Sequence, residues 1–420
     1  MYAPLVKVGF SPLDEELGLL PGRMTPRLQE ALVRLSTWIP SFAKAANEFA
    51  WFTQVKVDRS TAARITESAG AAAVKVYARE VERIERECPE APAGPDTLIF
   101  SVDGAMVPLQ HREWAEVRTL AVGVVAPAVQ HKGESVIKTH DLSYFSRLAN
   151  SETFSQQALG ELHRRGMETA RRVGAVVDGA VWCQSCIDLH YPEAVRILDF
   201  AHAAEYINAI GRPKGIPAAL LAETEIERLR HDLKHTGPAT VLDELRPLVA
   251  AYPDLPDLQS ALAYLEKREA QMQYPQFVAQ GWPIGSGCVE SANKLVVEDR
   301  LKGAGMHWAT PHVNPMLALR NAVCNDRWTE VWSQIELQQR QLTLAHRSQQ
   351  RLERRQRRSP PNPVADLPPV QPAPVLTPSA TSLPAPAASI NLSAPRQPSA
   401  HHPWHQTWSV RRQRQLANTP

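Results

Sequence analysis

Long apolar segments are missing from this sequence, and their absence excludes several classes of protein. None of the 420 residues belongs to a run of about 18 consecutive apolar residues, so we predict no transmembrane helix. The opening stretch MYAPLVKVGFSPLDEELG has neither a basic start nor an apolar centre, so no secretory signal peptide is evident. The sequence therefore predicts a protein without membrane association.

Cysteine is also scarce. The five cysteines are scattered, odd in number and absent before Cys88, which argues against a disulfide framework and favours a reducing cytoplasm. With 44% hydrophobic and 21% charged residues, the composition suits a soluble globular protein of two or three domains.

Charge is nearly balanced overall but unevenly spread. The formal net charge is +2, yet residues 334–420 hold 11 Lys and Arg against 3 Asp and Glu, which leaves 35 against 41 for the rest. A basic C-terminal segment on a mildly acidic body fits a polyanionic partner, although a solvated basic tail gives the same count. Residues 332–358 are predicted as a polar, increasingly basic helix. Residues 359–420 hold 14 of the 35 prolines and too little apolar surface to offset chain entropy, so we predict disorder.

Short helices are predicted near the N-terminus. They are expected over 24–38, 41–52 and 57–70, followed by a connecting helix over 71–88 and a linker over 89–95. Thr25 and Pro26 suit the start of the first helix, and the third carries Arg59 and Arg64 and stops at Gly70. This pattern is typical of a helix-turn-helix unit that binds DNA, and small helical bundles of other function share it.

The middle of the chain alternates between apolar strands and amphipathic helices. Strands are predicted over 97–104, 118–126, 135–142, 173–180 and 194–200, with a long helix over 155–172 and only helices over 201–280. This order predicts a mixed α/β sheet followed by a helical block, with chain breaks near 211–217 and 237–238.

Two of the buried strands end in the same motif, Asp-Gly-Ala, at Asp103 and Asp178. The carboxyl ends of strands are where ligands bind in open α/β sheets. A third carboxylate, Glu290, stands on a helix behind the sequence GWPIGSG. Clustered carboxylates repel one another unless a cation such as Mg²⁺ joins them, and two such ions can clamp a phosphoryl transfer. Alternatively, both aspartates merely start turns, as Asp-Gly commonly does.

Several longer stretches resemble a known family. SVDGAMVPL, DLSYFSRLANSETF, AVVDGAVW, ILDFAHAAEY, QYPQFVAQGWPIGSGCVESANK and RLKGAGMHW are similar to segments of insertion-sequence DDE transposases of the Kra group, bacterial relatives of Mutator-like elements. The resemblance runs from about Phe10 to Trp332. It implies an RNase H-like core interrupted by a helical insertion, with Asp103, Asp178 and Glu290 as catalytic residues and metal ligands. It further implies two Mg²⁺ ions, with Mn²⁺ as a substitute.

The resemblance also implies partners and a domain order. The partners are double-stranded DNA, as terminal inverted repeats and as target, and further copies of the chain in a homo-oligomeric active complex associated with the nucleoid. The expected parts are a DNA-binding domain over 1–88, the RNase H-like core over 96–205 and 281–331, the insertion over 206–280, the basic helix over 332–358 and the tail over 359–420.

Weaker patterns surround these residues. Asp199 and His202, in DFAH, resemble an Asp-x-x-His motif of the family and could orient a ligand or contact DNA, although Asp199 could simply cap a helix. Lys294, Arg300 and Lys302 lie along the Glu290 helix and could contact the DNA backbone or form a solvated face. Cys183 and Cys186 form a single CxxC near His190, which we interpret as core packing with half a zinc site as the alternative.

The chain departs from the family pattern at its start. Relatives usually carry a Cys-containing, zinc-ribbon-like segment before the stretch PLDEELGL, and this sequence begins almost at that stretch. Recognition of the terminal repeats could therefore be weakened, and a DNA-binding protein that no longer transposes is the alternative to an active transposase. A hydrolase that uses paired carboxylates on sugars explains neither the basic tail nor the N-terminal helices. Metal-dependent cleavage of an element end distinguishes the three hypotheses.

Overall fold

The computed structural model describes residues 24–131, 134–214 and 219–358. The chain divides into two compact units, of which the first includes the described residues up to Arg340 and the second includes residues 341–358. No helix in these described ranges is long and apolar enough to cross a membrane. The predicted disorder of 359–420 lies outside the described residues.

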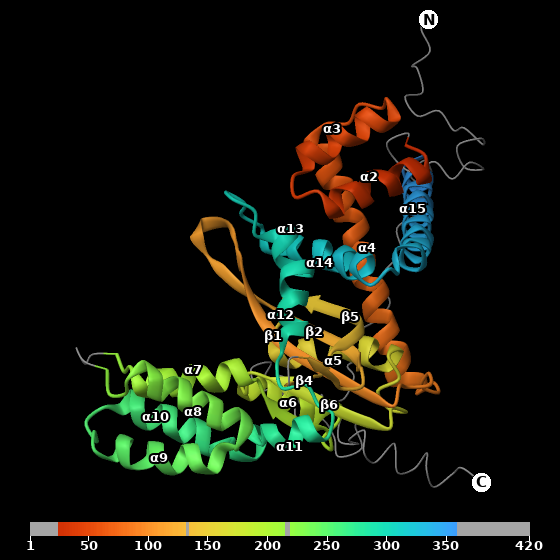
Figure 1. The fold of residues 1–420 in the computed structure, drawn as a ribbon. Helices are drawn as coiled ribbons and strands as arrows, with labels where there is room; N and C mark the ends of the chain where they lie inside the picture. The colour runs from red at the N-terminus through yellow and green to blue at the C-terminus, as the bar shows by residue number, and fades with distance from the viewer. Residues whose placement is uncertain (1–23, 132–133, 215–218, 359–420) are drawn as a thin grey trace, which may run out of the picture. The chain divides into compact units, whose positions relative to one another are not determined.

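A five-stranded mixed sheet forms the centre of the first unit (Figure 1). Its strands are β1 (Thr97–Pro108), β2 (Trp114–Val125), β5 (Thr139–Arg147), β6 (Arg172–Val177) and β7 (Val195–Leu198), in the spatial order β5-β2-β1-β6-β7. Strands β1, β2 and β5 pair antiparallel, whereas β6 is parallel to β1 and β7 is parallel to β6. Two short strands, β3 (Val129–His131) and β4 (Glu134–Val136), pair with each other. The predicted mixed α/β sheet is thus confirmed.

Helices cover both faces of the sheet, because successive side chains of a strand point to opposite faces. One face carries α5 (Ser151–Arg164) and α6 (Val181–His190), and the other carries α12 (Gly287–Ala292), the π-helical turn η3 (Asn293–Glu298), α13 (Asp299–Leu301) and α14 (Thr310–Cys324). Phe100 and Val177 pack toward the first group. Val107 and Ala121 pack toward the second.

The N-terminal part folds as the three predicted helices, each started by a capping side chain. They are α2 (Pro26–Trp38), α3 (Phe42–Thr53) and α4 (Arg59–Glu87). Thr25, Ser41 and Asp58 each accept a hydrogen bond from the backbone N–H three residues later, at 3.4, 3.4 and 2.8 Å. Such caps satisfy backbone donors that the first turn of a helix leaves unpaired.

The predicted stop at Gly70 is wrong, because α4, which is 29 residues long, continues through Gly70 and includes the predicted connecting helix. Gly70 is buried, and a Cβ atom at this position would lie 2.3 Å from the backbone oxygen of Pro315 on α14. Glycine therefore allows the two helices to approach closely here instead of ending the helix.

The helical insertion follows β7, and the described part of 201–280 contains no strand, as predicted. Its elements are α7 (Phe200–Gly211), α8 (Glu223–His235), α9 (Pro238–Ala250), α10 (Pro256–Lys267), the 3-10 turn η2 (Glu269–Met272) and α11 (Tyr274–Ala279). Leu229, Leu245 and Leu265 pack in one core with Ile197 of β7 and with Trp282. The insertion (green in Figure 1) thus shares its core with the edge of the sheet.

Several predicted strands have different limits, since β2 already starts at Trp114 and β6 already ends at Val177. Strand β1 does not end at Asp103 but runs to Pro108, because β2 pairs with it along the whole hairpin. The strand predicted over 135–142 is divided between β4 and β5, and β5 continues to Arg147.

Two helices also begin earlier than predicted. Helix α5 starts at Ser151, because the Asn150 side chain accepts from the N–H of Thr153 at 2.8 Å, and it ends before Gly166, whose φ is +65°. The basic helix, α15 (Trp328–Arg358), starts four residues before the predicted range, with Trp328 and Trp332 buried against α4 and α14.

Candidate active site

Asp103 and Asp178 lie in one row on neighbouring strands. Strands β1 and β6 are parallel, and the last pair in their register is Phe100 with Ala175. Three residues further along each strand stand Asp103 and Asp178. The register therefore places both aspartates side by side at the carboxyl ends of the paired segments, the edge at which open α/β sheets bind ligands.

Asp199 extends this row to a third parallel strand. Val177 pairs with Leu198 in the register of β6 and β7, and the next residues are Asp178 and Asp199. Because strand side chains alternate between the two faces, the aspartates in this row share one face, which is the face that α12 covers.

Helix α12 brings Glu290 to the same face. The preceding turn is tied to the start of α7, since the N–H of Phe200 donates to the carbonyl of Ile284 at 2.9 Å. Close packing does not require the glycines of this turn, because a Cβ at Gly285 or Gly287 would meet nothing within 4 Å. The turn is held by hydrogen bonds to the start of α7, and not by a close approach that only glycine would permit.

The acidic residues line one small cavity of about 220 Å³. Its ionisable lining consists of Asp103, Asp178, Asp199, His202, Glu205 and Glu290. The structure thus brings together the three predicted catalytic residues and the predicted Asp-x-x-His pair. So many carboxylates in one cavity repel one another unless protons or cations compensate their charge.

Asp103 is the residue on which this repulsion has its clearest effect. Burial raises the pKa of Asp103, and the negative charges of Asp178 and Glu290 raise it further. Hydrogen bonds oppose the shift: Gly104 N–H donates to Oδ1 at 2.7 Å, and Asn293 Nδ2 donates to Oδ2 at 2.8 Å. A cation bound beside Asp103 would favour its ionised form.

Asp199 uses both of its carboxylate oxygens on the backbone. Oδ1 accepts from the N–H of His202 at 2.8 Å, which caps α7, and Oδ2 accepts from the N–H of Ser286 at 2.5 Å. The capping interpretation is therefore confirmed, and the second bond attaches the turn before Glu290 to the end of β7. The sequence did not predict Glu205, whose Oε2 lies 3.6 Å from His202 Nδ1, although its position three residues along the same helix was a usable indication.

The donor set suits a hard divalent cation, because the candidate ligands are carboxylate oxygens. In the described ranges, no three His, Cys, Asp or Glu side chains stand close enough together to hold a metal ion as they are placed. The carboxylates of Asp103, Asp178 and Glu290 thus share a cavity without forming a closed coordination group, and ion binding would require their side chains to move.

Two side chains of the insertion reach the segment that follows β6. The hydroxyl of Tyr264 on α10 donates to the backbone carbonyl of Asp178. Arg268 donates to the backbone carbonyl of Gly179 from Nη2 at 2.5 Å and from Nε at 3.2 Å. The sequence gave no indication of these contacts, because 86 and 89 residues separate the partners. Asn293 was also missed, although it lies three residues after Glu290.

The CxxC pair packs in the core, as the preferred interpretation predicted. Cys183 and Cys186 are buried on α6, and burial raises the pKa of the Cys186 thiol to about 11. Nε2 of the buried His190 lies 2.7 Å from the carbonyl oxygen of Ser155. Both thiols belong to the apolar core between the sheet and α6, whereas Nδ1 of His190 is buried without a hydrogen-bond partner in the described part of the chain.

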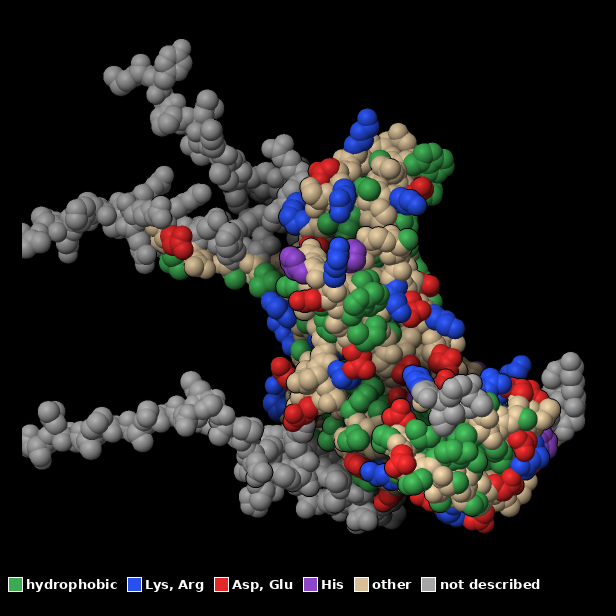
Figure 2. All heavy atoms as spheres, turned by 90° about the vertical axis from the view of Figure 1, so that its left-hand side faces the viewer, with side chains coloured by type: hydrophobic (Ala, Val, Ile, Leu, Met, Phe, Trp, Pro, Cys, Tyr) green, Lys and Arg blue, Asp and Glu red, His purple; other side chains and the backbone are tan. Residues whose placement is uncertain are grey.

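Most of the predicted DNA contacts are on the surface. Arg59, Arg64, Lys294 and Lys302 are exposed, and Lys302 pairs with Glu298 at 2.7 Å. In Figure 2, Lys and Arg side chains are frequent over the upper part of the face, at the level of α3 and α13 in Figure 1. Asp and Glu side chains are more frequent over the lower part.

Arg300 does not fit its predicted role as a DNA contact, because it is only 1% exposed. Its Nε donates to the carbonyl of Ser36 at 3.0 Å, and its guanidinium lies 4.9 Å from the ring centre of Phe42 and 5.1 Å from that of Trp308. Arg300 therefore connects the N-terminal helices to the helical stretch that follows Glu290 from inside the protein.

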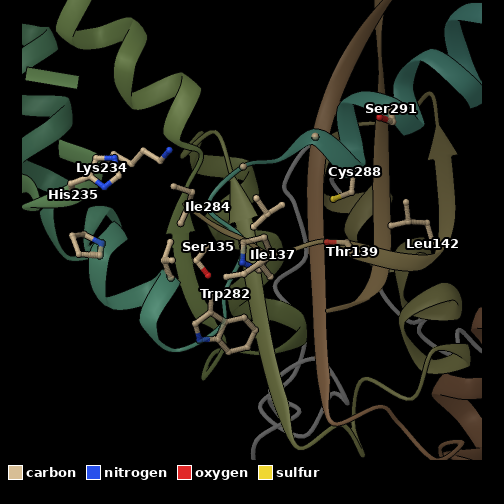
Figure 3. Close-up of a pocket in the computed structure, with 16 residues that line it drawn as sticks. Ser135, Ile137, Thr139, Leu142, Lys234, His235, Trp282, Ile284, Cys288 and Ser291 are labelled. Carbon is tan, nitrogen blue, oxygen red and sulfur yellow. The ribbon is translucent and has the colours of Figure 1, made fainter. Parts of the chain in front are cut away.

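A larger cavity of about 820 Å³ adjoins the same turn (Figure 3). Lys234 and His235 from α8 lie on one side of it, Cys288 and Ser291 from α12 lie on the other, and the ring of Trp282 lines it below. Ser286 lines the acidic cavity, whereas the glycines on either side of it line the larger one. The turn at residues 285–287 thus separates the acidic cavity from the larger, mostly apolar cavity.

Comparisons of the chain with models of known protein families and with curated proteins found no match.

Proposed function

We propose that this chain is a divalent-metal-dependent DDE-type DNA transposase of the Kra group, with an RNase H-like core interrupted by the helical insertion. The observation that carries the proposal is the convergence of Asp103, Asp178 and Glu290 on one cavity, although 75 and 112 residues separate them in sequence. These are the three residues that the family resemblance designates. Support for an RNase H-like core comes from the two aspartate-bearing strands, which are neighbours within the sheet, and from the Glu290 helix, which covers their shared face.

Asp103, Asp178 and Glu290 would hold Mg²⁺, or Mn²⁺ in its place, which when bound would lower the pKa of the attacking hydroxyl group and neutralise charge on the phosphate. Hydrogen bonds from neighbouring groups of the chain orient at least one of these ligands. Asn293 and the N–H of Gly104 orient the carboxylate of Asp103.

DNA would approach from the exposed side of this cavity. Lys294 follows Glu290 by four residues and is exposed, so it can contact a phosphate near the cleaved bond. Arg59 and Arg64 are exposed on α4 and would contribute contacts from the N-terminal helices. In the reaction, a water oxygen bonds to phosphorus at the element end and the bond to the 3′ oxygen breaks. The freed 3′-hydroxyl oxygen then bonds to a phosphorus of the target DNA, the bond from that phosphorus to the target strand's own 3′ oxygen breaks, and this oxygen leaves as a new 3′-hydroxyl.

Substitution of the three carboxylates tests the proposal. We expect Asp103→Asn, Asp178→Asn and Glu290→Gln each to lower Mg²⁺-dependent strand cleavage by at least about 100-fold, because each removes charge that acts in the transition state. The substrate is a duplex that carries the DNA flanking the coding sequence of this chain. DNA affinity, measured by fluorescence anisotropy, should change little, because most backbone contacts lie elsewhere.

Asp96→Asn is the matched control. Asp96 precedes the first residue of β1, pairs with Arg171 on the surface and is remote from the carboxyl edge, so cleavage should persist. Near-native cleavage by any one of the three cavity variants would remove that residue from the assignment. DNA binding by the unsubstituted chain without cleavage in Mg²⁺ or Mn²⁺ would favour the alternative, a DNA-binding protein that no longer transposes.

A further inference from the structure

Two side chains of the helical insertion form hydrogen bonds to the backbone at Asp178 and Gly179. Tyr264 donates to the carbonyl of Asp178, and Arg268 donates twice to the carbonyl of Gly179. Arg268 is 9% exposed and also donates from Nη1 to the carbonyl of Tyr264 at 3.1 Å. Two consecutive carbonyls after β6 are therefore bound by one side-chain pair at the end of α10.

The pair is itself held by stacking. The Arg268 guanidinium lies 3.6 Å from the centre of the Tyr264 ring, and the Tyr206 ring is stacked on Tyr264 at 3.9 Å with an angle of 8°. Both groups cannot occupy one face of the ring at these distances, so they enclose it from opposite faces. The His202 ring meets the edges of both tyrosines, at 5.4 and 6.0 Å. A side chain of the acidic cavity thus belongs to the same stack.

The absence of a side chain at Gly179 permits this contact. Its φ is +78°, in the region that favours glycine, and a Cβ there would lie 2.5 Å from Arg268 Nε and 2.6 Å from the Tyr264 hydroxyl. The second residue of the second Asp-Gly-Ala motif is therefore small because the insertion occupies the space beside it.

On the other side, the Asp178 carboxylate is held by its own loop. Oδ1 accepts from the N–H of Ala180 at 2.9 Å, and Cys183 Sγ lies 3.2 Å from the same oxygen. If the carbonyls of residues 178 and 179 were released, the peptide planes that aim both the carboxylate and the Ala180 N–H could rotate. The orientation of this carboxylate depends on groups from outside the sheet.

We propose that Tyr264 and Arg268 are positioning residues, which fix the carboxylate of Asp178 for cation binding by holding its backbone. This inference rests on the proposed function for its relevance to catalysis. The insertion then does more than occupy space between β7 and Glu290: it completes one ligand of the site. Neither residue touches the cation or DNA in this assignment.

Tyr264→Phe is the direct test, because it removes one hydroxyl and keeps the stacked ring. Tyr206→Phe is the matched control on the partner ring, since no hydrogen bond of its hydroxyl occurs within the described ranges. Mn²⁺ binding to the full chain without DNA, followed by electron paramagnetic resonance of free Mn²⁺, gives a readout apart from activity. We expect Tyr264→Phe to weaken binding about 10-fold, as removal of groups that orient metal ligands typically does. Tyr206→Phe should stay within about 2-fold.

Hydrogen exchange supplies a second readout that needs no metal. Peptides that cover residues 178–183 should exchange faster in Tyr264→Phe than in Tyr206→Phe, with equal thermal midpoints for the two variants. If Tyr264→Phe fails to fold, Arg268→Lys replaces it, because lysine keeps the charge and loses the two-donor geometry. Equal exchange and equal Mn²⁺ affinity in the Tyr264 and Tyr206 variants would overturn the proposal.

The same experiment separates this inference from the proposed function. An unsubstituted chain that binds Mn²⁺ but cleaves no DNA would contradict transposition, while the exchange and Mn²⁺ comparisons would still decide the role of Tyr264. An unsubstituted chain that binds no Mn²⁺ would overturn both proposals. Cleavage that survives with unchanged Mg²⁺ requirement in Tyr264→Phe would overturn the positioning role alone.

Discussion

Replacement of Gly70 with alanine tests the close approach between α4 and α14. A Cβ at this position would lie 2.3, 2.6 and 2.8 Å from the O, C and Cα atoms of Pro315, which are backbone atoms that cannot rotate away. Helix propensity favours alanine over glycine by about 0.8–1.0 kcal/mol. Moving packed elements apart to admit an extra methyl group costs about 1–3 kcal/mol. We therefore expect Gly70→Ala to lower the free energy of unfolding by about 1 kcal/mol, against the trend of propensity.

Gly160→Ala on α5 is the matched control, because its Cβ would meet only Val81 Cγ2, at an ordinary 3.4 Å. Propensity should dominate there and raise stability by about 0.5–1 kcal/mol. Urea unfolding followed by tryptophan fluorescence suits the comparison, since Trp328 and Trp332 lie in the core that contains the α4–α14 contact. Midpoints are compared between variants with equal m values, because a chain of this size need not unfold in two states. If Gly70→Ala stabilised the protein as much as Gly160→Ala does, the close helix approach would be refuted.

Two further predictions concern buried basic side chains, His190 and Arg300. Burial lowers the pKa of His190 from its ordinary 6.5 to about 4, so the unfolded chain takes up this proton first, and the free energy of unfolding should fall as the pH drops from about 6.5 to 4. His190→Gln should flatten that fall in urea titrations at several pH values, and an unchanged pH profile would count against a buried neutral histidine. Arg300→Ala should lower stability by about 2–4 kcal/mol, as large-to-small core substitutions do, yet leave the salt dependence of DNA binding unchanged. Lys294→Ala should leave stability nearly unchanged and reduce the slope of log DNA affinity against log salt concentration by about 0.9. A reduced slope in Arg300→Ala would restore Arg300 as a DNA contact.

The elements of this protein were largely predictable because their local patterns are strong. Short stretches of sequence were enough to predict the capping residues of the N-terminal helices, the apolar strands and the breaks in the insertion. The limits of β1 were not predictable in this way. Its last residues are held by pairing with β2, and the sequence around Asp103 looks the same whether the strand ends there or continues.

Glycine illustrates the same limit more sharply. The sequence predicted a helix stop at Gly70 and a helix that continues through Gly166, and the structure reverses both predictions. What distinguishes Gly70 is the backbone of Pro315, which lies 245 residues later in the chain (315 − 70). Arg300 and Lys294 differ for a similar reason. They lie on the successive elements α13 and η3, and only the packing of Phe42 and Trp308 against Arg300 shows which of the two is buried.

The acidic residues of the candidate site differ in what they contact, and no sequence motif could have predicted this difference. Asp103, Asp178 and Asp199 stand in one row across three parallel strands, so their local sequences suggest equivalent roles. Asp199, however, gives one oxygen to the N–H of His202 and the other to that of Ser286, and it is 5% exposed. Asp103 also accepts a hydrogen bond at each oxygen, but one of its donors is the side chain of Asn293, which can rotate with it. Both donors to Asp199 are backbone groups, so turning this carboxylate toward an ion would leave them unpaired, and an unpaired buried donor costs about 1–3 kcal/mol. Asp199 therefore holds the turn that carries Glu290, and under the proposed function ion binding would fall to the aspartates beside it in the row.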